Sequence, residues 1–135
     1  MAGSFSVSQA ALEAFRGESS RIIAETASRA LGRKEDVAQH GAEAPRLITS
    51  GIEFTVRMLD AAMAAGESAV LEDGLRWSMD RLPHDGVSTE QVLSRFALLR
   101  GDVKECMPPA PAAEVIAVIL WMEKRLHELA AGRKG

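Results

Sequence analysis

Apolar residues recur three or four positions apart along almost the whole chain, and the two-residue alternation of a surface strand is nearly absent. This spacing is the period of an amphipathic α-helix. Within residues 45–66, one helical face carries Ile48, Ile52, Val56 and Met63. The pattern predicts an all-α fold of about five or six helices in a single domain, 1–135, with its core at about residues 9–131.

Local signals set the expected helix ends. Besides 45–66, helices are predicted over residues 9–31, 68–82, 88–107 and 111–131. Capping side chains and helix stops recur between them, and Gly17 is expected to weaken or break the first helix. The signals are the N-caps Ser8 and Ser68, the capping box of Ser88 and Gln91, the stops Gly32 and Gly66, and the barrier Pro108-Pro109. The polar residues 33–44 are expected to form a loop with at most one short turn.

Composition narrows the function classes. The chain is 47% apolar and 26% charged, with a net charge of -3, so nucleic acid is not an expected partner. Cys106 is the one cysteine, and no apolar run is long enough for a membrane span. The start of the chain shows no secretory leader. These observations predict a cytoplasmic protein with no membrane association.

The order of the helices and several short motifs resemble the globin-like core of phycobiliproteins. The stretch "VRMLDAAMAAGESAVLEDGL", residues 56–75, is similar to the segment in that family in which a leucine-arginine-tyrosine motif precedes alanine-glycine-aspartate and valine-leucine-acid-aspartate. Gly86-Val87 matches the turn into the next helix, and "SSRIIAETASRAL", residues 19–31, is similar to an early helix. The resemblance covers roughly residues 15–105 and implies a globin-like fold.

Two departures from the family exclude an antenna subunit. Phycobiliproteins attach a bilin through a cysteine and hold it with an arginine and an aspartate, whereas the aligned positions here are Ile48, Ser50 and Gly51. Too few residues precede the core to form the N-terminal hairpin that pairs phycobiliprotein subunits. The chain is also similar to globin-like sensor domains of bacterial stress-signalling proteins, many of which bind no haem. The resemblance therefore implies a sensor-like relative without a covalent pigment.

Haem, metal and catalytic sites find little support in the sequence. His84 is the nearest candidate for a haem ligand, but it lies in "LPHDG", which is typical of a turn, and haem is less expected than a bilin. The three histidines and Cys106 show no metal-ligand spacing, so no metal site is expected. No nucleophile motif is present, so we expect neither catalytic residues nor enzyme activity. Cys106 continues an apolar stripe and is expected to be a small core residue.

A non-covalent linear tetrapyrrole such as biliverdin is the best guess for a ligand. It needs an apolar slot, an aromatic wall and cations for its propionates. The candidate binding residues are Arg57, Arg76, Trp77, Asp80, Arg81 and His84. Trp77 would form the wall, the arginines would bind propionates, and Asp80 would accept from pyrrole N–H groups. The simpler alternative is that Arg76 and Asp80 form a surface ion pair and that Trp77 belongs to the core or an interface.

The last helix supports a competing interpretation. It is apolar nearly all round from Val115 to Met122 and carries Trp121, which is typical of a central core helix or of one half of a homodimer interface. The leading hypothesis is a sensory or regulatory module that binds a small hydrophobic ligand. The alternative is a ligand-free module for dimerisation or protein interaction of the stress-signalling type.

Overall fold

The computed structural model describes residues 6–134, and these residues form helices and connecting turns with no β-strand. Six α-helices occur in this range, with two short 3₁₀ helices. Their bounds are α1 Gln9–Leu31, α2 Lys34–His40, η1 Gly41–Glu43, α3 Ala44–Ala65, α4 Ala69–Arg81, η2 Leu82–Asp85, α5 Thr89–Cys106 and α6 Pro109–Lys134. The all-α class predicted from the periodicity is therefore confirmed. The expectation about a leader falls partly on residues 1–5, which lie outside the described residues.

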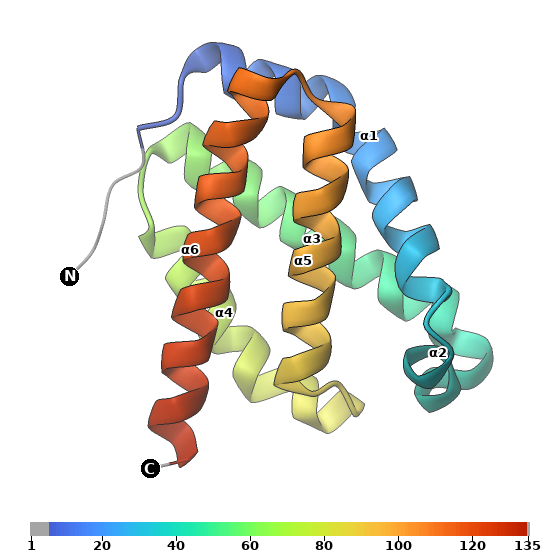
Figure 1. Ribbon diagram of the computed structural model, residues 1–135. Coiled ribbons are helices and arrows are strands. Elements are labelled where there is room, and N and C mark those ends of the chain that lie inside the picture. The colour runs from blue at the N-terminus through green and yellow to red at the C-terminus, as the bar shows by residue number, and fades with distance from the viewer. Residues whose placement is uncertain (1–5, 135) are drawn as a thin grey trace.

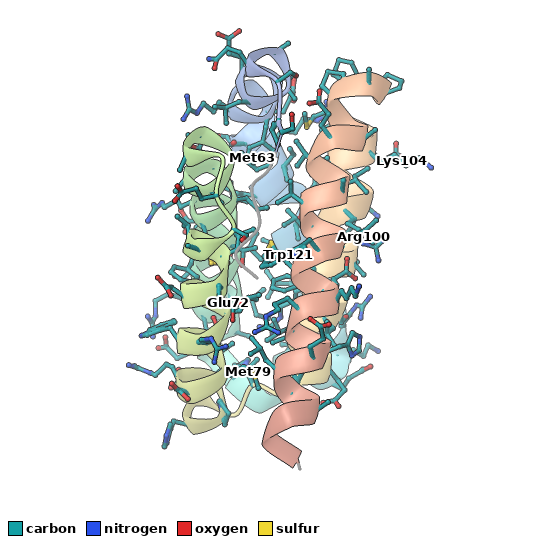
Figure 2. The ribbon with its side chains drawn as sticks, turned by 90° about the vertical axis from the view of Figure 1, so that its left-hand side faces the viewer. Met63, Glu72, Met79, Arg100, Lys104 and Trp121 are labelled. Atoms are coloured by element: carbon teal, nitrogen blue, oxygen red, sulfur yellow. The ribbon has the colours of Figure 1, made fainter. Side chains whose placement is uncertain are left out.

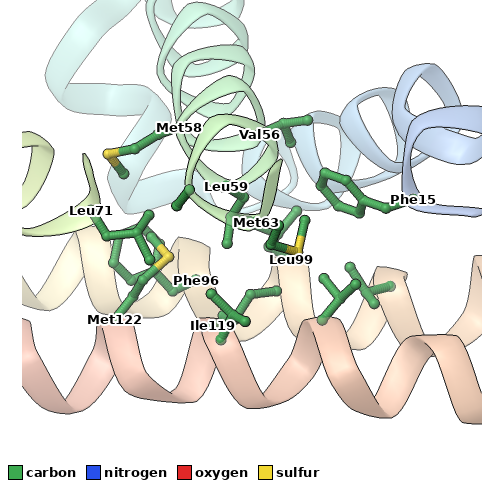
Figure 3. Packing of buried hydrophobic residues seen from close by; sticks show 14 of the residues in the cluster. Phe15, Val56, Met58, Leu59, Met63, Leu71, Phe96, Leu99, Ile119 and Met122 are labelled. Carbon is green, nitrogen blue, oxygen red and sulfur yellow. The ribbon is translucent and has the colours of Figure 1, made fainter. Parts of the chain in front are cut away.

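Two layers of helices enclose the core (Figure 1). The neighbours α5 and α6 run antiparallel along one side, and α1 and α3 pack against each other behind them. The fully buried side chains include Phe15, Leu59, Leu99, Ile119 and Met122, which come from four different helices. Figure 3 shows these residues meeting in one cluster between α1, α3, α5 and α6. Burial of this apolar surface is the main force that holds the helices together.

Most of the local signals act as the sequence predicted. Ser8 Oγ accepts a hydrogen bond from the Ala11 amide at 3.1 Å, and both bonds of the Ser88–Gln91 capping box are present. Gly66 has a φ of 71°, so it ends α3 in the left-handed conformation that favours glycine. The α5 helix ends at Cys106, directly ahead of Met107 and the two prolines.

Several local predictions were wrong. The α1 helix runs through Gly17 without interruption, and Gly32 ends it with a right-handed φ of −75°. Residues 33–44 are mostly helical, because Val37 packs against a small second cluster that also holds buried Ala44. Ser68 precedes α4 but makes no capping bond with its side chain.

Arginine–carboxylate pairs link neighbouring helices around the core. Arg16 donates from Nε and Nη2 to Asp60 at 2.8 and 2.9 Å, which joins α1 to α3. Arg100 makes a similar two-point contact with Glu123 and joins α5 to α6. Such forked pairs fix the relative position of two helices more sharply than apolar contact does.

The link between α1 and α5 is buried. The Asp102 side chain is 2% exposed and accepts hydrogen bonds from Thr26 Oγ1 at 2.8 Å and from Arg29 Nε at 2.9 Å. Thr26 is fully buried, whereas the Arg29 side chain remains 54% exposed. The carboxylate thus gives the buried Thr26 hydroxyl its hydrogen-bond partner.

We predict that Asp102→Ala lowers the free energy of unfolding by about 2 kcal/mol, because it removes two hydrogen bonds to a charged group and leaves Thr26 Oγ1 unsatisfied. Urea denaturation followed by circular dichroism measures the loss. Asp73→Ala, on an exposed position of α4, is the matched control and should change stability by less than about 0.5 kcal/mol. Equal stability of the two variants would contradict the structural role of Asp102.

Candidate functional site

A pocket of about 290 Å³ opens between α3, α4, η2 and α5. We call it the aromatic pocket, because Phe54, Trp77 and Phe96 line it. The described residues include only five aromatic side chains, so this pocket holds more than half of them. Its remaining apolar walls come from Leu47, Ile52, Met58, Leu82, Val87 and Val92. An apolar cavity of this size is near the lower end of the range for small-ligand sites, which is roughly 300–1,000 Å³.

Trp77 and Phe54 stand at the rim of the aromatic pocket. Their ring centroids are 5.4 Å apart and the rings are tilted by 45°. Trp77 is 53% exposed and Phe54 is 40% exposed, so neither ring is needed to fill the core. Exposed aromatic groups beside a cavity are unusual in a soluble protein and are typical of a surface that receives another molecule.

Polar groups in the aromatic pocket are few. The charged residues of its lining are Arg95 of α5 and Asp85 of η2, and Asp85 accepts a hydrogen bond from Arg81 Nε at 3.3 Å. His40 contributes a ring nitrogen, Nε2, that is buried without a hydrogen-bond partner. Ser50 and Thr55 of α3 also line the pocket. This lining combines a large apolar wall with a few donors, one of which is cationic.

Met58 shapes the side of the aromatic pocket that lies between α3 and α4. It is 7% exposed and extends from α3 toward α4 (Figure 3). Gly74 makes room for it, because a Cβ atom at that position would overlap Met58 Sδ. The small residue on α4 therefore lets the two helices approach closely at one end of the pocket.

Of the six residues that the sequence suggested, the structure places Trp77 in the lining of the pocket. The three arginines are mostly exposed and pair within their own helical segments. Arg57 Nη2 lies 3.9 Å from Glu53, Arg76 Nε lies 2.8 Å from Glu72, and Arg81 Nε lies 3.3 Å from Asp85. His84 and Asp80 are exposed, on η2 and α4, and neither lines the pocket. The structure thus does not bring the predicted cations together around Trp77.

Arg95 is the charged pocket residue of α5 that the sequence did not suggest, and Phe54, Phe96 and His40 were not predicted as site residues either. Arg95 lies three positions after Val92 and four before Leu99, on the apolar face of α5. A cation in register with an inward-facing stripe is the signal that could have identified it, because charged residues are rarely placed there without a partner or a role.

The carboxylate of Glu72 joins α4 to α6. It accepts from Arg125 Nε at 2.6 Å and Nη2 at 2.8 Å, and it also accepts from Arg76. Figure 2 shows Glu72 and Met79 on the side of α4 that faces α6. The hydrogen bonds from Arg125 lower the pKa of Glu72 below its usual value, and Arg76 adds a smaller effect.

Other candidate centres lack the required geometry. No group of three potential metal ligands occurs among residues 6–134, and no helix in this range is long and apolar enough to cross a membrane. Cys106 packs against the core, and burial raises the pKa of its thiol. A raised pKa leaves less thiolate at neutral pH, which disfavours a nucleophilic role.

Comparison with family models, with curated proteins and with solved structures found no match for this chain. Its site therefore has to be interpreted from its own geometry.

We predict that Glu72→Gln destabilises the protein by about 1 kcal/mol at pH 7 and by progressively less as the pH falls below about 4.5. The pKa of Glu72 is lower in the folded protein than in the unfolded chain. Its contribution to stability is therefore complete at a pH above the unfolded-state pKa, and it is lost as the pH falls through the folded-state pKa. Urea titrations of both proteins from pH 7 to acid measure the difference. A difference that stays constant with pH would contradict the assignment. Asp73→Asn, on the neighbouring exposed position, controls for the change in net charge.

Proposed function

We propose that this chain is a sensory or regulatory module that binds a small amphipathic ligand in the aromatic pocket. The observation that carries the proposal is the concentration of Phe54, Trp77 and Phe96 around one apolar cavity. Arg95, His40, Ser50 and Thr55 supply the few polar contacts that would orient a ligand. Apolar walls with a small number of such groups are characteristic of ligand sites.

The resemblance to phycobiliproteins adds support from an independent direction. Ser50 and Gly51 line the aromatic pocket, and the resemblance aligns them with positions at which that family holds its pigment. A non-covalent biliverdin-type bilin is accordingly one specific candidate. However, a pocket of about 290 Å³ lies below the usual range for drug-sized ligands, so a tetrapyrrole would require α4 to move outward. A smaller ligand fits the pocket as it stands.

Two glycine positions offer a matched test. Gly51 lines the pocket on α3, and Gly17 lies on α1 away from the pocket. A Cβ atom at either position would meet no atom within 4 Å, and both positions are helical. Replacing glycine by leucine inside a helix favours the helix by up to about 1 kcal/mol, so both variants should fold.

We predict that Gly51→Leu weakens ligand binding at least about tenfold by filling the pocket, and that Gly17→Leu leaves binding unchanged. The probe is anilinonaphthalene sulfonate, which joins aromatic rings to an anion. Quenching of Trp77 fluorescence in a Trp121→Phe background reports binding at the site. Biliverdin is tested separately by its absorption spectrum after gel filtration. If neither probe binds, or if the two leucine variants bind equally, the proposed site is wrong.

The competing function is self-association through the α5–α6 face. A depression of about 650 Å³ there is lined mainly by small residues, including Ala97, Gly101, Ala113 and Ala117. Arg100 and Lys104 also border it. Leu120 of α6 borders it and is 48% exposed, which makes it one of the large apolar side chains that the fold leaves in water. This exposed leucine is the observation that favours a homodimer.

We predict that, if the face pairs two copies, the protein sediments as a dimer and Leu120→Lys converts it to a monomer, because a lysine cannot be buried there without a partner. Analytical ultracentrifugation over a range of concentrations measures the state. Ala24→Lys, on an exposed position of α1, controls for added charge. Monomeric wild-type protein at high concentration would exclude the dimer hypothesis.

A further inference from the structure

A second pocket lies directly beside the aromatic pocket. It has a volume of about 240 Å³ and is lined by residues of α4, η2, the start of α5 and α6. We call it the aliphatic pocket, because Leu75, Met79, Leu126 and Ala130 belong to its lining. Its lining contains no charged residue among those that the structure describes.

The two pockets share part of their lining. Ser78, Leu82, Val87 and Val92 appear in both, so a layer about one side chain thick separates them. Leu82 is the residue of this partition that can move most readily. It is only partly buried, it begins η2, and its side chain has more freedom than those of the two β-branched valines.

The polar groups are distributed unevenly between the pockets. Arg95, His40, Ser50, Thr55 and Asp85 line only the aromatic pocket, whereas Ser88 and Thr89 line only the aliphatic pocket and Ser78 lines both. Arg95 is the cation of this set, and Asp85 is engaged by Arg81. The hydroxyl oxygens of Ser78 and Ser88 already make hydrogen bonds within their own helices. A ligand that fills both pockets would therefore place its anionic or polar head on the aromatic side and an apolar tail on the aliphatic side.

We infer that the ligand is a single acyl chain with an anionic head, long enough to pass Leu82 and occupy both pockets. This inference rests on the proposed function, because it requires the aromatic pocket to be a binding site. A flexible chain can bend past Leu82 from one cavity into the other, whereas a single rigid ring system can occupy only one of the two cavities.

A series of saturated fatty acids from octanoate to palmitate tests the inference. Displacement of anilinonaphthalene sulfonate measures the dissociation constant of each acid. Each additional buried methylene should tighten binding about fourfold until both pockets are full. An affinity that stops rising at the short acids would show that only the aromatic pocket is used and would overturn the inference.

Two neighbouring alanines on α6 provide the matched variants. Ala130 lines the aliphatic pocket but not the aromatic pocket, and Ala131 is exposed. Ala130→Leu should weaken palmitate binding at least about tenfold while octanoate binds as before, because the added side chain fills the space for the tail. Ala131→Leu should bind both acids like the wild type.

The outcomes separate the inference from the proposed function. One outcome is that octanoate binds and that Gly51→Leu weakens this binding, while palmitate binds no more tightly than octanoate and Ala130→Leu leaves palmitate binding unchanged. In that case the proposed function stands and the acyl-chain inference fails. If neither acid binds, and anilinonaphthalene sulfonate does not bind either, the acyl-chain inference and the proposed function both fail. Octanol and octanoate are compared in the same assay, and equal affinity would overturn the assignment of an anionic head.

Discussion

The contact between Glu72 and Arg125 is a two-point ion pair that ties α4 to α6. The α4 helix buries only Leu71 and Leu75 completely, and neither lies beyond its midpoint. The two-point contact to Arg125 lies in the first half of the helix. Beyond it, the C-terminal half of α4 borders the aromatic pocket through Trp77 and Ser78 and the aliphatic pocket through Met79. The helix is thus tied to α6 near its start, and its C-terminal half borders both pockets.

Much of the fold could be predicted from the sequence because its signals are local. The apolar spacing of α3 and α5, the Ser88–Gln91 capping box and the left-handed Gly66 depend on residues within one or two helical turns. The errors have a different origin. Residues 34–40 become helical through tertiary contact of Val37, and Asp102 is buried because Thr26 and Arg29 reach it from another helix. The spacing of residues along the chain predicts neither of these contacts.

The candidate site shows the same division. Trp77 was identified as a possible wall because it is a rare aromatic residue, and that reasoning does not depend on tertiary structure. The arginines are predicted as cations for propionates. A carboxylate four positions before an arginine is, however, the favoured helical pairing, and both Glu53–Arg57 and Glu72–Arg76 have that spacing. Arginines engaged in this way are directed along their own helix. The cation that lines the pocket, Arg95, comes from α5, and its place in the same lining as Trp77 depends on how α3, α4 and α5 pack.

The segment that carries Trp77 lies between two glycines with positive φ, Gly66 at 71° and Gly86 at 76°. Any other residue would be strained at these points, so each end of the segment is a joint at which the chain direction changes sharply. The second half of α4 and η2 has cavities beside it and lacks a fully buried side chain, so this part is expected to open more readily than the first half of α4. In a hydrogen-exchange experiment, the backbone amides of residues 76–85 would therefore exchange before those of the surrounding helices. A molecule bound in the pockets would slow the exchange of these amides.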